Sequence, residues 1–315
     1  MYPLISIIIP TYNREDIIGQ TLESIKNQTY INWECLIVDD GSLDETKRLI
    51  ESFAKADSRF KYLERPKDKL KGPNSCRNFG YSYSKGELVH FFDSDDLYKR
   101  ETLMSIVSVF KNDIDVIVCK SELIDFNSGE VLKENNIESE TLIQDFFVEK
   151  INFYVCGPFW NKDFLKNQKE LFDEAIGNGD DWDFNLRMLY KKPRLKFLNE
   201  ALLQVRIHPN SFSREKRKFN KKELQSEFKV IERHYQIIKT NKEINKDTIQ
   251  KYIVKRFNSY FMEALLKKNK ISWILFLKVL KKEFEFNQYK QLIRTIFGFI
   301  SYNLFKKGYS YLHIK

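Results

Sequence analysis

Three carboxylates within four residues form the strongest chemical signal in the sequence. Asp93, Asp95 and Asp96 directly follow Glu87–Phe92, a mostly apolar segment typical of a buried strand. Carboxylates held this close repel one another, and a divalent cation with hard oxygen ligands relieves the repulsion. The segment therefore predicts a site for Mn²⁺ or Mg²⁺ at which phosphate oxygens share the coordination. The alternative is an acidic loop that caps the next helix, because Asp is favoured at helix N-termini.

Two other polar segments close apolar strands near the N-terminus. Pro10–Asn13 ends the first strand and Asp39–Ser42 ends the second. Tyr12 can stack on a nucleobase, and a carboxylate can accept a hydrogen bond from a base or a ribose hydroxyl. Arg77 opens a short predicted helix, and its guanidinium has the shape to pair with a phosphate. Each of these features also has a structural explanation, as a turn, a helix cap or a surface ion pair.

Strand and helix patterns alternate through the first 120 residues, which predicts a mostly parallel α/β sheet flanked by helices. Ligands bind such sheets beyond the carboxyl ends of the strands, where the polar segments fall. The expected strands are Leu4–Ile9, Trp33–Val38, Phe60–Leu63, Glu87–Phe92 and Asp115–Cys119, and the expected helices are Glu15–Gln28, Asn74–Ser84 and Arg100–Lys111. From Ser121 to Ser213 we expect a hairpin, a helix and two strands, at Glu122–Lys133, Asp181–Leu189, Leu195–Leu198 and Ala201–Ile207.

The C-terminal third is strongly basic. Residues 214–315 hold 25 Lys and Arg against 9 Asp and Glu, whereas residues 1–213 hold 28 against 35. Apolar residues recur there at helical spacing, so we expect a basic amphipathic helical extension. Two interpretations remain open: peripheral contact with an anionic membrane through Ile271–Leu277 and Thr295–Phe305, or a bundle that packs on the rest of the chain or forms a homodimer. No aromatic platform with interleaved basic residues favours nucleic acid.

Targeting and redox signals favour a cytoplasmic protein, with the inner face of the plasma membrane as a possible site. No signal peptide is visible, and no apolar run approaches the ~20 residues that cross a bilayer. Cys35, Cys76, Cys119 and Cys156 are widely spaced, which disfavours a zinc site and fits a reducing compartment.

Six motifs, in order along residues 1–213, resemble those of the family 2 glycosyltransferases, which have the GT-A fold. They are Pro10-Thr11-Tyr12-Asn13, Val38-Asp39-Asp40-Gly41-Ser42, Arg77-Asn78-x-Gly80, Asp93-Ser94-Asp95-Asp96, Gly179-Asp180-Asp181-Trp182-Asp183-Phe184 with Arg187, and Arg206-Ile207-His208-Pro209-Asn210-Ser211. The sequence departs slightly from the family at Asp180, where Glu is usual.

The resemblance implies roles for these residues. A nucleotide-sugar donor, with uridine the expected nucleoside, would be held by Pro10, Thr11, Tyr12, Asp39, Asp40, Arg77 and Ser94. The metal would be held by Asp93, Asp95 and His208, with Asp95 favoured for direct contact. Asp181 would be the catalytic base, and Asp180 and Trp182 would contact the acceptor. Trp160 is a further acceptor candidate because aromatic faces suit sugar rings, with core packing as the alternative.

The sequence therefore predicts an inverting transfer of a sugar to a hydroxyl of a saccharide or lipid-linked saccharide, in bacterial surface polysaccharide synthesis. Residues 1–120 are the expected nucleotide-sugar half of a catalytic domain and 121–213 its acceptor half. A nucleotidyltransferase is one alternative, although Pro10–Asn13 stands where a Gly-rich triphosphate loop is usual. A non-catalytic nucleotide-sugar or polysaccharide binding module is another, which the carboxylates at Asp93, Asp95 and Asp181 disfavour.

Overall fold

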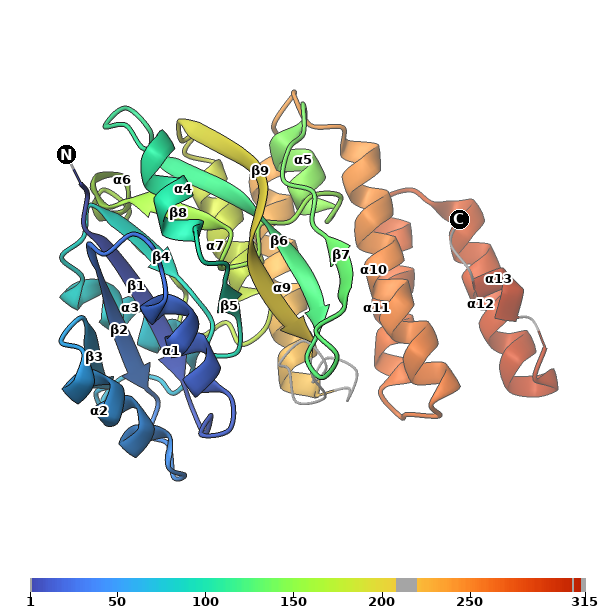
Figure 1. Ribbon diagram of the computed structural model, residues 1–315. Coiled ribbons are helices and arrows are strands. Elements are labelled where there is room, and N and C mark those ends of the chain that lie inside the picture. Colours follow the sequence, from blue (N-terminus) through green and yellow to red (C-terminus); the bar gives the residue numbers. More distant parts are fainter. Residues whose placement is uncertain (1, 208–219, 308, 313–315) are drawn as a thin grey trace. The chain divides into compact units, whose positions relative to one another are not determined.

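The chain forms two compact units, Met1–Phe212 and Ser213–Lys315. The computed structural model describes residues 2–207, 220–307 and 309–312 (Figure 1). In those residues the first unit combines helices with a sheet, and the second is entirely helical.

One mixed sheet of nine strands runs through the described part of the first unit, in the order β3-β2-β1-β4-β8-β6-β9-β5, with β7 paired to β6. Neighbours among β1 to β4 are parallel, as are β6 and β9. The strand β8 is antiparallel to both β4 and β6. The strands are β1 (Ile5–Thr11), β2 (Trp33–Asp39), β3 (Phe60–Glu64), β4 (Leu88–Phe91), β5 (Leu97–Tyr98), β6 (Val116–Asp125), β7 (Val131–Glu134), β8 (Pro158–Asn161) and β9 (Leu195–Ile207).

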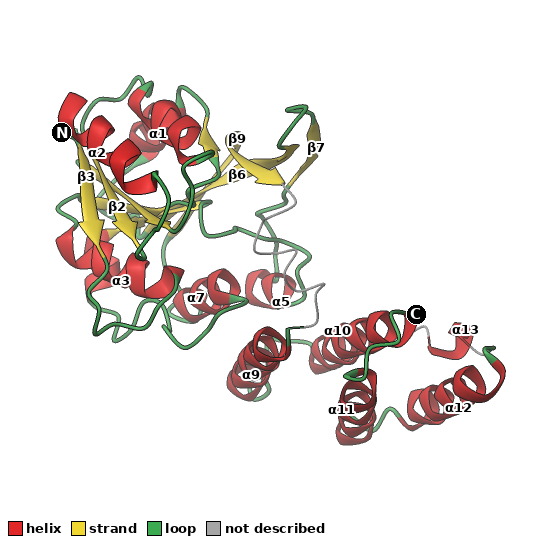
Figure 2. Cartoon of the chain, turned by 90° about the horizontal axis from the view of Figure 1, so that it is seen from below, coloured by secondary structure: helices red, strands yellow, loops and turns green. Residues whose placement is uncertain are grey.

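Helices cover both faces of the parallel half of this sheet, and Figure 2 shows α1 and α2 on one side with α3 on the other. The helix α1 buries Ile18, Leu22 and Ile25, which lie on one face at helical spacing. The helices of the first unit are α1 (Ile18–Lys26), α2 (Thr46–Ala56), α3 (Pro73–Tyr83), α4 (Thr102–Val109), α5 (Leu142–Phe147), α6 (Lys162–Lys166) and α7 (Asp180–Leu189).

The predicted α/β fold is confirmed, and each expected strand and helix of the first unit appears with its ends shifted by a few residues. The predicted hairpin is β6 with β7, and the two last expected strands are one strand, β9. The sheet is less parallel than predicted because β8 enters between β4 and β6. This strand has only four residues, Pro158–Asn161, and is nearly all buried, so it lacks the alternation that marks a longer strand.

The second unit contains five described helices, α9 (Lys221–Ile238), α10 (Lys246–Leu266), α11 (Ser272–Glu285), α12 (Tyr289–Phe305) and α13 (Tyr309–Leu312). Its core is aromatic: Phe276 of α11 stacks on Phe299 of α12, with ring centroids 4.0 Å apart. Ion pairs between α9 and the next helices add to it, such as Lys282 with Glu232. Among the described helices, none is both long and apolar enough to cross a membrane.

Close contact between α3 and the sheet depends on a glycine. A Cβ at Gly80 would lie 2.5 Å from Ile8 Cγ2 of β1 and 3.1 Å from Val38 Cγ2 of β2. These distances leave no room for a methyl group without movement of the helix. Gly80 therefore sets how near α3, and every side chain on its inner face, lies to β1 and β2.

We expect Gly80→Ala to lower the free energy of unfolding by about 1–3 kcal/mol, because the methyl group overpacks the contact with β1. Gly19→Ala in α1 is the matched control, since its Cβ would meet Leu49 Cδ2 at an ordinary 3.6 Å. That change should instead stabilise the protein by about 0.5–1 kcal/mol, as a helical Gly is replaced by Ala. Urea unfolding followed by circular dichroism measures both; equal effects of the two changes would contradict the close contact.

Candidate active site

The acidic segment after β4 forms a compact cluster. Asp93, Asp95 and Asp96 each offer an oxygen, and these oxygens lie within 4.8 Å of one another. Asp96 is buried, and its pKa is raised well above the usual value by burial and by the charges of Asp95 and Asp93. Burial and the charge of Asp95 also raise the pKa of Asp93, although the nearby Arg77 lowers it. The cluster is therefore short of positive charge.

The cluster fits a divalent cation. Asp93 uses one carboxylate oxygen to accept a hydrogen bond from Arg77, and Asp96 uses one to accept from the backbone N–H of Arg206. Hard carboxylate oxygens at this spacing are the ligands that Mg²⁺ and Mn²⁺ prefer. The predicted pair Asp93 and Asp95 thus lies together, with Asp96 as a third donor. The remaining predicted ligand, His208, lies outside the described residues.

Arg206 holds the acidic segment from β9. Its backbone N–H donates to Asp96 Oδ1 (3.0 Å), and its side chain donates to the carbonyl of Asp95 and to Gln20 of α1. The neighbouring Thr21 hydroxyl donates to the carbonyl of Ser94 (3.0 Å). Ser94 itself is buried. Two elements far apart in the sequence, α1 and β9, therefore fix the backbone that presents the carboxylates.

Arg77 joins the acidic cluster to the start of α7. The guanidinium is buried and donates to Asp93 Oδ1 (2.8 Å), to Asp180 Oδ2 (2.6 Å) and to Asn74 Oδ1 (3.0 Å). Burial lowers the pKa of Arg77, but the charges of Asp93 and Asp180 outweigh that effect and raise it, so the group stays charged. Its Nε is buried with no hydrogen-bond partner among the described residues.

Asp181 lies in the first turn of α7, beside the Asp180 that Arg77 binds. Asp180, Asp181 and Asp183 all fall in that turn, where the N–H groups favour negative charge. Asp183 is 1% exposed and is paired with Arg187 inside the same helix. Asp181 is partly exposed, which leaves it the more accessible of the two to a substrate.

The aromatic residues predicted for the acceptor differ in accessibility. Trp182 is partly exposed, donates from Nε1 to the carbonyl of Phe146 (3.2 Å) and packs against Phe147. Trp160 is 1% exposed in β8, with its ring between Phe164 and Phe184. Core packing therefore accounts for Trp160, and its ring offers no open face to a sugar.

The ends of β1 and β2 carry the predicted nucleotide residues. Thr11, next to the buried Pro10, has a buried hydroxyl with no hydrogen-bond partner among the described residues. Tyr12 is partly exposed, and Lys71 Nζ lies 3.9 Å from the centre of its ring. A ring open to solvent beside an unpartnered hydroxyl and a cation fits a nucleotide.

Asp39 and Asp40 form more hydrogen bonds and ion pairs within the protein than their motif suggests. Asp39 Oδ1 accepts from the backbone N–H and hydroxyl of Ser42, and its Oδ2 accepts from the Tyr62 hydroxyl. These bonds hold the turn after β2. Asp40 forms an ion pair with Arg65, and both side chains are about one-tenth exposed. A ligand that binds Asp40 would therefore meet Arg65 as well.

His90, three residues before Asp93, is not a metal ligand. Its Nε2 donates to the Cys156 carbonyl (2.5 Å), so the other ring nitrogen, Nδ1, accepts from the Tyr98 hydroxyl. The ring is fully buried and stacks on Phe159. Burial lowers its pKa to about 3, so it stays neutral. His90 thus anchors β4 to β8 beneath the acidic segment.

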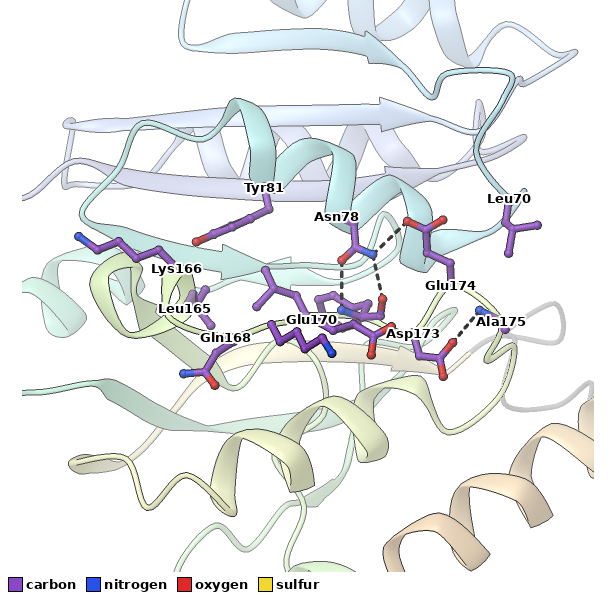
Figure 3. Close-up of a pocket in the computed structure, with 13 residues that line it drawn as sticks. Leu70, Asn78, Tyr81, Leu165, Lys166, Gln168, Glu170, Asp173, Glu174 and Ala175 are labelled. Atoms are coloured by element: carbon purple, nitrogen blue, oxygen red, sulfur yellow. Dashed lines mark hydrogen bonds between the residues drawn. The ribbon is translucent and has the colours of Figure 1, made fainter.

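A cavity of about 580 Å³ lies on the outer side of α3, and no predicted site residue lines it (Figure 3). There the amide of Asn78 donates to the Phe172 carbonyl (2.8 Å) and to Glu174 (3.1 Å). Asn74 likewise donates to the carbonyls of Asp173 and Ile176. These two amides tie α3 to the segment before α7, which positions the helix that carries Asp181.

Sequence reasoning missed the roles of four basic residues, Arg14, Arg65, Lys71 and Arg206. Arg14 lies 4.0 Å from Asp95. Arg65 pairs with Asp40, Lys71 lies over the Tyr12 ring, and Arg206 binds the acidic segment. Each of the four lies at or after the end of a strand, or near a predicted motif. For Arg65 a signal existed, since it directly follows β3, where the rule for parallel sheets places ligands. Arg206 was recognised only as part of a motif, because its contacts depend on pairing between β5 and β9.

We expect Arg77→Lys to lower the free energy of unfolding by about 1–3 kcal/mol, because one ammonium group cannot replace a guanidinium that bridges three acceptors. Arg194→Lys is the matched control: Arg194 also binds a carboxylate, that of Asp115, but its side chain is 61% exposed. That change should cost less than about 1 kcal/mol. Chemical unfolding compares the two, and an Arg77→Lys variant as stable as the wild type would refute the bridging role.

Comparison with known proteins identifies the family. The family model described as glycosyl transferase family 2 matches residues 6–167, which is just over half of the chain. EpsJ of Bacillus subtilis, an uncharacterized glycosyltransferase, is 27% identical over 222 residues, or 68% of this chain and 64% of EpsJ. WfgD of Escherichia coli, a UDP-Glc:alpha-D-GlcNAc-diphosphoundecaprenol beta-1,3-glucosyltransferase, is 39% identical over 126 residues, or 40% of this chain and 48% of WfgD. The matches thus span less than two thirds of either relative.

Solved structures share the fold. TarS of S. aureus (residues 1–349, with UDP-GlcNAc) aligns over 82% of this chain and 81% of its own, with a TM-score of 0.57 and 20% identity. The mannosyltransferase PcManGT of Pyrobaculum calidifontis, with GDP-Man and Mn²⁺, aligns over 98% of this chain and 88% of its own, with a TM-score of 0.57 and 14% identity. These similarities confirm the expected GT-A fold. The chain therefore belongs to glycosyl transferase family 2.

Proposed function

We propose that this chain transfers a sugar, with inversion at its anomeric carbon, from a UDP-sugar to a hydroxyl of a saccharide or lipid-linked saccharide. The observation that carries the proposal is the contact of Arg77 with both Asp93 and Asp180. It places a carboxylate cluster suited to a metal and a diphosphate next to the helix turn that bears Asp181. Donor and acceptor groups would therefore meet at the carboxyl ends of β1, β2 and β4.

The proposed roles fall on two sides of the reacting sugar, the diphosphate side and the acceptor side. Asp93, Asp95 and Asp96 would hold the cation, which, when bound, would stabilise the charge that develops on the leaving diphosphate. Arg77 keeps Asp93 in place and brings a further positive charge to this side. On the other side Asp181 would accept the proton of the attacking hydroxyl. A single displacement between the two sides inverts the anomeric carbon.

The donor and the acceptor classes are supported by relatives. WfgD is named for UDP-Glc as donor and for a sugar linked to diphosphoundecaprenol as acceptor. TarS has been solved with UDP-GlcNAc, and PcManGT with GDP-Man and Mn²⁺. The partly exposed Tyr12 would supply a surface for the nucleoside, together with the Thr11 hydroxyl, which has no partner within the described part of the chain. We further propose that the enzyme works in the cytoplasm, in the assembly of a surface polysaccharide, with Mn²⁺ or Mg²⁺ as its cofactor.

Calorimetric titration of UDP and GDP, with Mn²⁺ and with EDTA, tests the donor and the metal together. We expect UDP to bind in Mn²⁺ and binding to weaken at least about tenfold in EDTA, because the cation neutralises charge between the diphosphate and the Asp cluster. Asp95→Asn should weaken binding in Mn²⁺ and leave little further effect of EDTA. Selective GDP binding would overturn the UDP donor but not the metal site. UDP binding unaffected by EDTA would overturn the metal.

Substitution of the proposed base separates catalysis from binding. Asp181→Asn should lower the rate of transfer by about 10²–10⁴-fold, the usual contribution of a general base, and leave UDP affinity unchanged. Asp163→Asn is the control, because Asp163 lies in α6 with its side chain 79% exposed and contacts Lys166. Radiolabelled transfer to a mixture of saccharide and lipid-linked acceptors measures the rate. A variant with the transfer rate of the wild type would show that Asp181 is not the base.

A further inference from the structure

One side of the second unit carries a continuous stripe of exposed apolar residues. On α12 the stripe residues follow one another at intervals of four, four, three and four residues, so they lie along a single helix face. Each is at least half exposed: Tyr289, Ile293, Phe297, Ile300 and Leu304. The opposite side of the helix is the one that packs, since Thr295, Gly298 and Phe299 are buried. The stripe is thus not part of the core of the unit.

The exposed apolar residues of α11 extend this stripe. Trp273, Leu277 and Phe284 are more than half exposed and are spaced by four and seven residues, on one face of the helix. Phe284 meets Tyr289 of α12, with ring centroids 6.0 Å apart. Trp273 lies edge-on to Phe299, near the other end of the helix pair. The exposed residues of α11 therefore border α12 at both ends, and together the two stripes form what we call the α11–α12 face.

This clustering is unusual for a protein surface. Half of the large hydrophobic side chains that are exposed in the described residues lie on α11, α12 and α13. Single exposed apolar residues are common, but a contiguous patch of this kind marks an interaction site. Aromatic residues dominate its ends, with Trp273, Phe284 and Tyr289 among them, as is typical of helices in a membrane interface.

The charges beside the face are mainly positive. From Phe286 to Lys315 the sequence has five Lys and Arg residues and no Asp or Glu. Lys290 and Arg294 each follow a stripe residue and are exposed, and Lys306 and Lys307 follow the end of α12. Lys281 of α11 is exposed too. Glu285, next to Phe284, is exposed as well but pairs with Lys282 (2.9 Å). Bulky apolar side chains flanked mainly by cations complement an anionic lipid surface, which attracts cations and accepts apolar groups.

A second copy of the chain is a weaker match for the same face. In a two-fold dimer the same patch is used twice, so each Lys290 and Arg294 would approach the like charges of the other copy. An anionic bilayer presents no such conflict. We propose that the α11–α12 face docks the protein on an anionic membrane surface, lying in the interface and not crossing it. No described helix could span a bilayer, which fits this orientation.

Trp273 provides a direct reporter of docking. It is 59% exposed, whereas Trp33 and Trp160 are almost fully buried. The remaining tryptophan, Trp182, is only partly exposed and lies outside the α11–α12 face, so a change of environment on docking should act mainly on Trp273. We expect the full chain to sediment with vesicles of phosphatidylcholine and phosphatidylglycerol, with a blue shift of tryptophan emission. Binding to phosphatidylcholine alone should be weaker, and added salt should reduce binding to the anionic vesicles. Trp273→Phe should remove most of the shift and keep most of the binding.

Two variants dissect the face. Ile293→Ser with Leu304→Ser should lower the partition coefficient by about tenfold or more, because two inserted side chains are lost. Lys290→Gln with Arg294→Gln should lower it on the order of tenfold and reduce its salt dependence. The matched control is Ile31→Ser with Leu43→Ser, which removes two highly exposed apolar residues of the first unit. All changed side chains are exposed, so circular dichroism should show folded proteins.

The outcomes are distinct from those of the nucleotide assays, because sedimentation needs no donor or acceptor. Loss of binding in both face variants, with the control unchanged, would support the proposal. Failure of the wild type to bind anionic vesicles would overturn it, as would equal binding by wild type and face variants. A wild-type dimer in analytical ultracentrifugation that Ile293→Ser with Leu304→Ser converts to a monomer, without vesicle binding, would assign the face to a second copy and overturn the membrane role.

Discussion

The buried guanidinium of Arg77 is the interaction on which the rest of the candidate site depends. Asp93 and Asp180 belong to distant segments, and each would be costly to place near other carboxylates without a fixed cation. Arg77 can reach both because α3 lies close to β1 and β2, and that closeness depends on Gly80, one helical turn further along the same buried face. Gly80 thus determines the geometry of the charged groups through packing alone, because it has no side chain and takes no part in the chemistry.

The acidic cluster does not stabilise the fold near neutral pH, whereas the proposed binding of a metal ion accounts for its presence. In the folded chain the pKa of Asp96 is raised above its unfolded value by burial and by its neighbours. The contribution of such a group to stability is present below the unfolded pKa and is lost as the pH rises through the folded pKa. Near neutral pH the cluster therefore opposes folding. The surrounding structure compensates through the hydrogen bonds of Arg206 and the core formed by β4, β8 and His90, and a bound cation would offset the repulsion further.

Local features of the sequence were predictable, and contacts across the fold were not. The acidic segment, the strands that end at Thr11 and Asp39, and the first turn of α7 follow from residue types and spacing within a few positions. The pairing of Arg77 with Asp180, and of Arg65 with Asp40, depends on which strands are neighbours, which periodicity does not encode. Trp160 shows the same limit: its four-residue strand is buried between β4 and β6, a placement that only the sheet order determines. Aromatic composition alone therefore suggested an accessible ring where the structure has a core residue.

The two units have opposite charge, and this difference connects the proposed function with the proposed membrane contact. Residues 1–213 carry more acidic than basic residues, so an anionic membrane would repel them, whereas residues 214–315 carry 25 Lys and Arg against 9 Asp and Glu. An enzyme that acts on a lipid-linked acceptor gains if it stays at the membrane, because a tethered acceptor then has a high effective concentration at the site. The proposed metal binding and proton transfer both depend on acidic residues of the first unit, and lysines could not take over those proposed roles. Attraction to the membrane must then come from elsewhere in the chain, and the α11–α12 face combines the apolar side chains and cations that it requires.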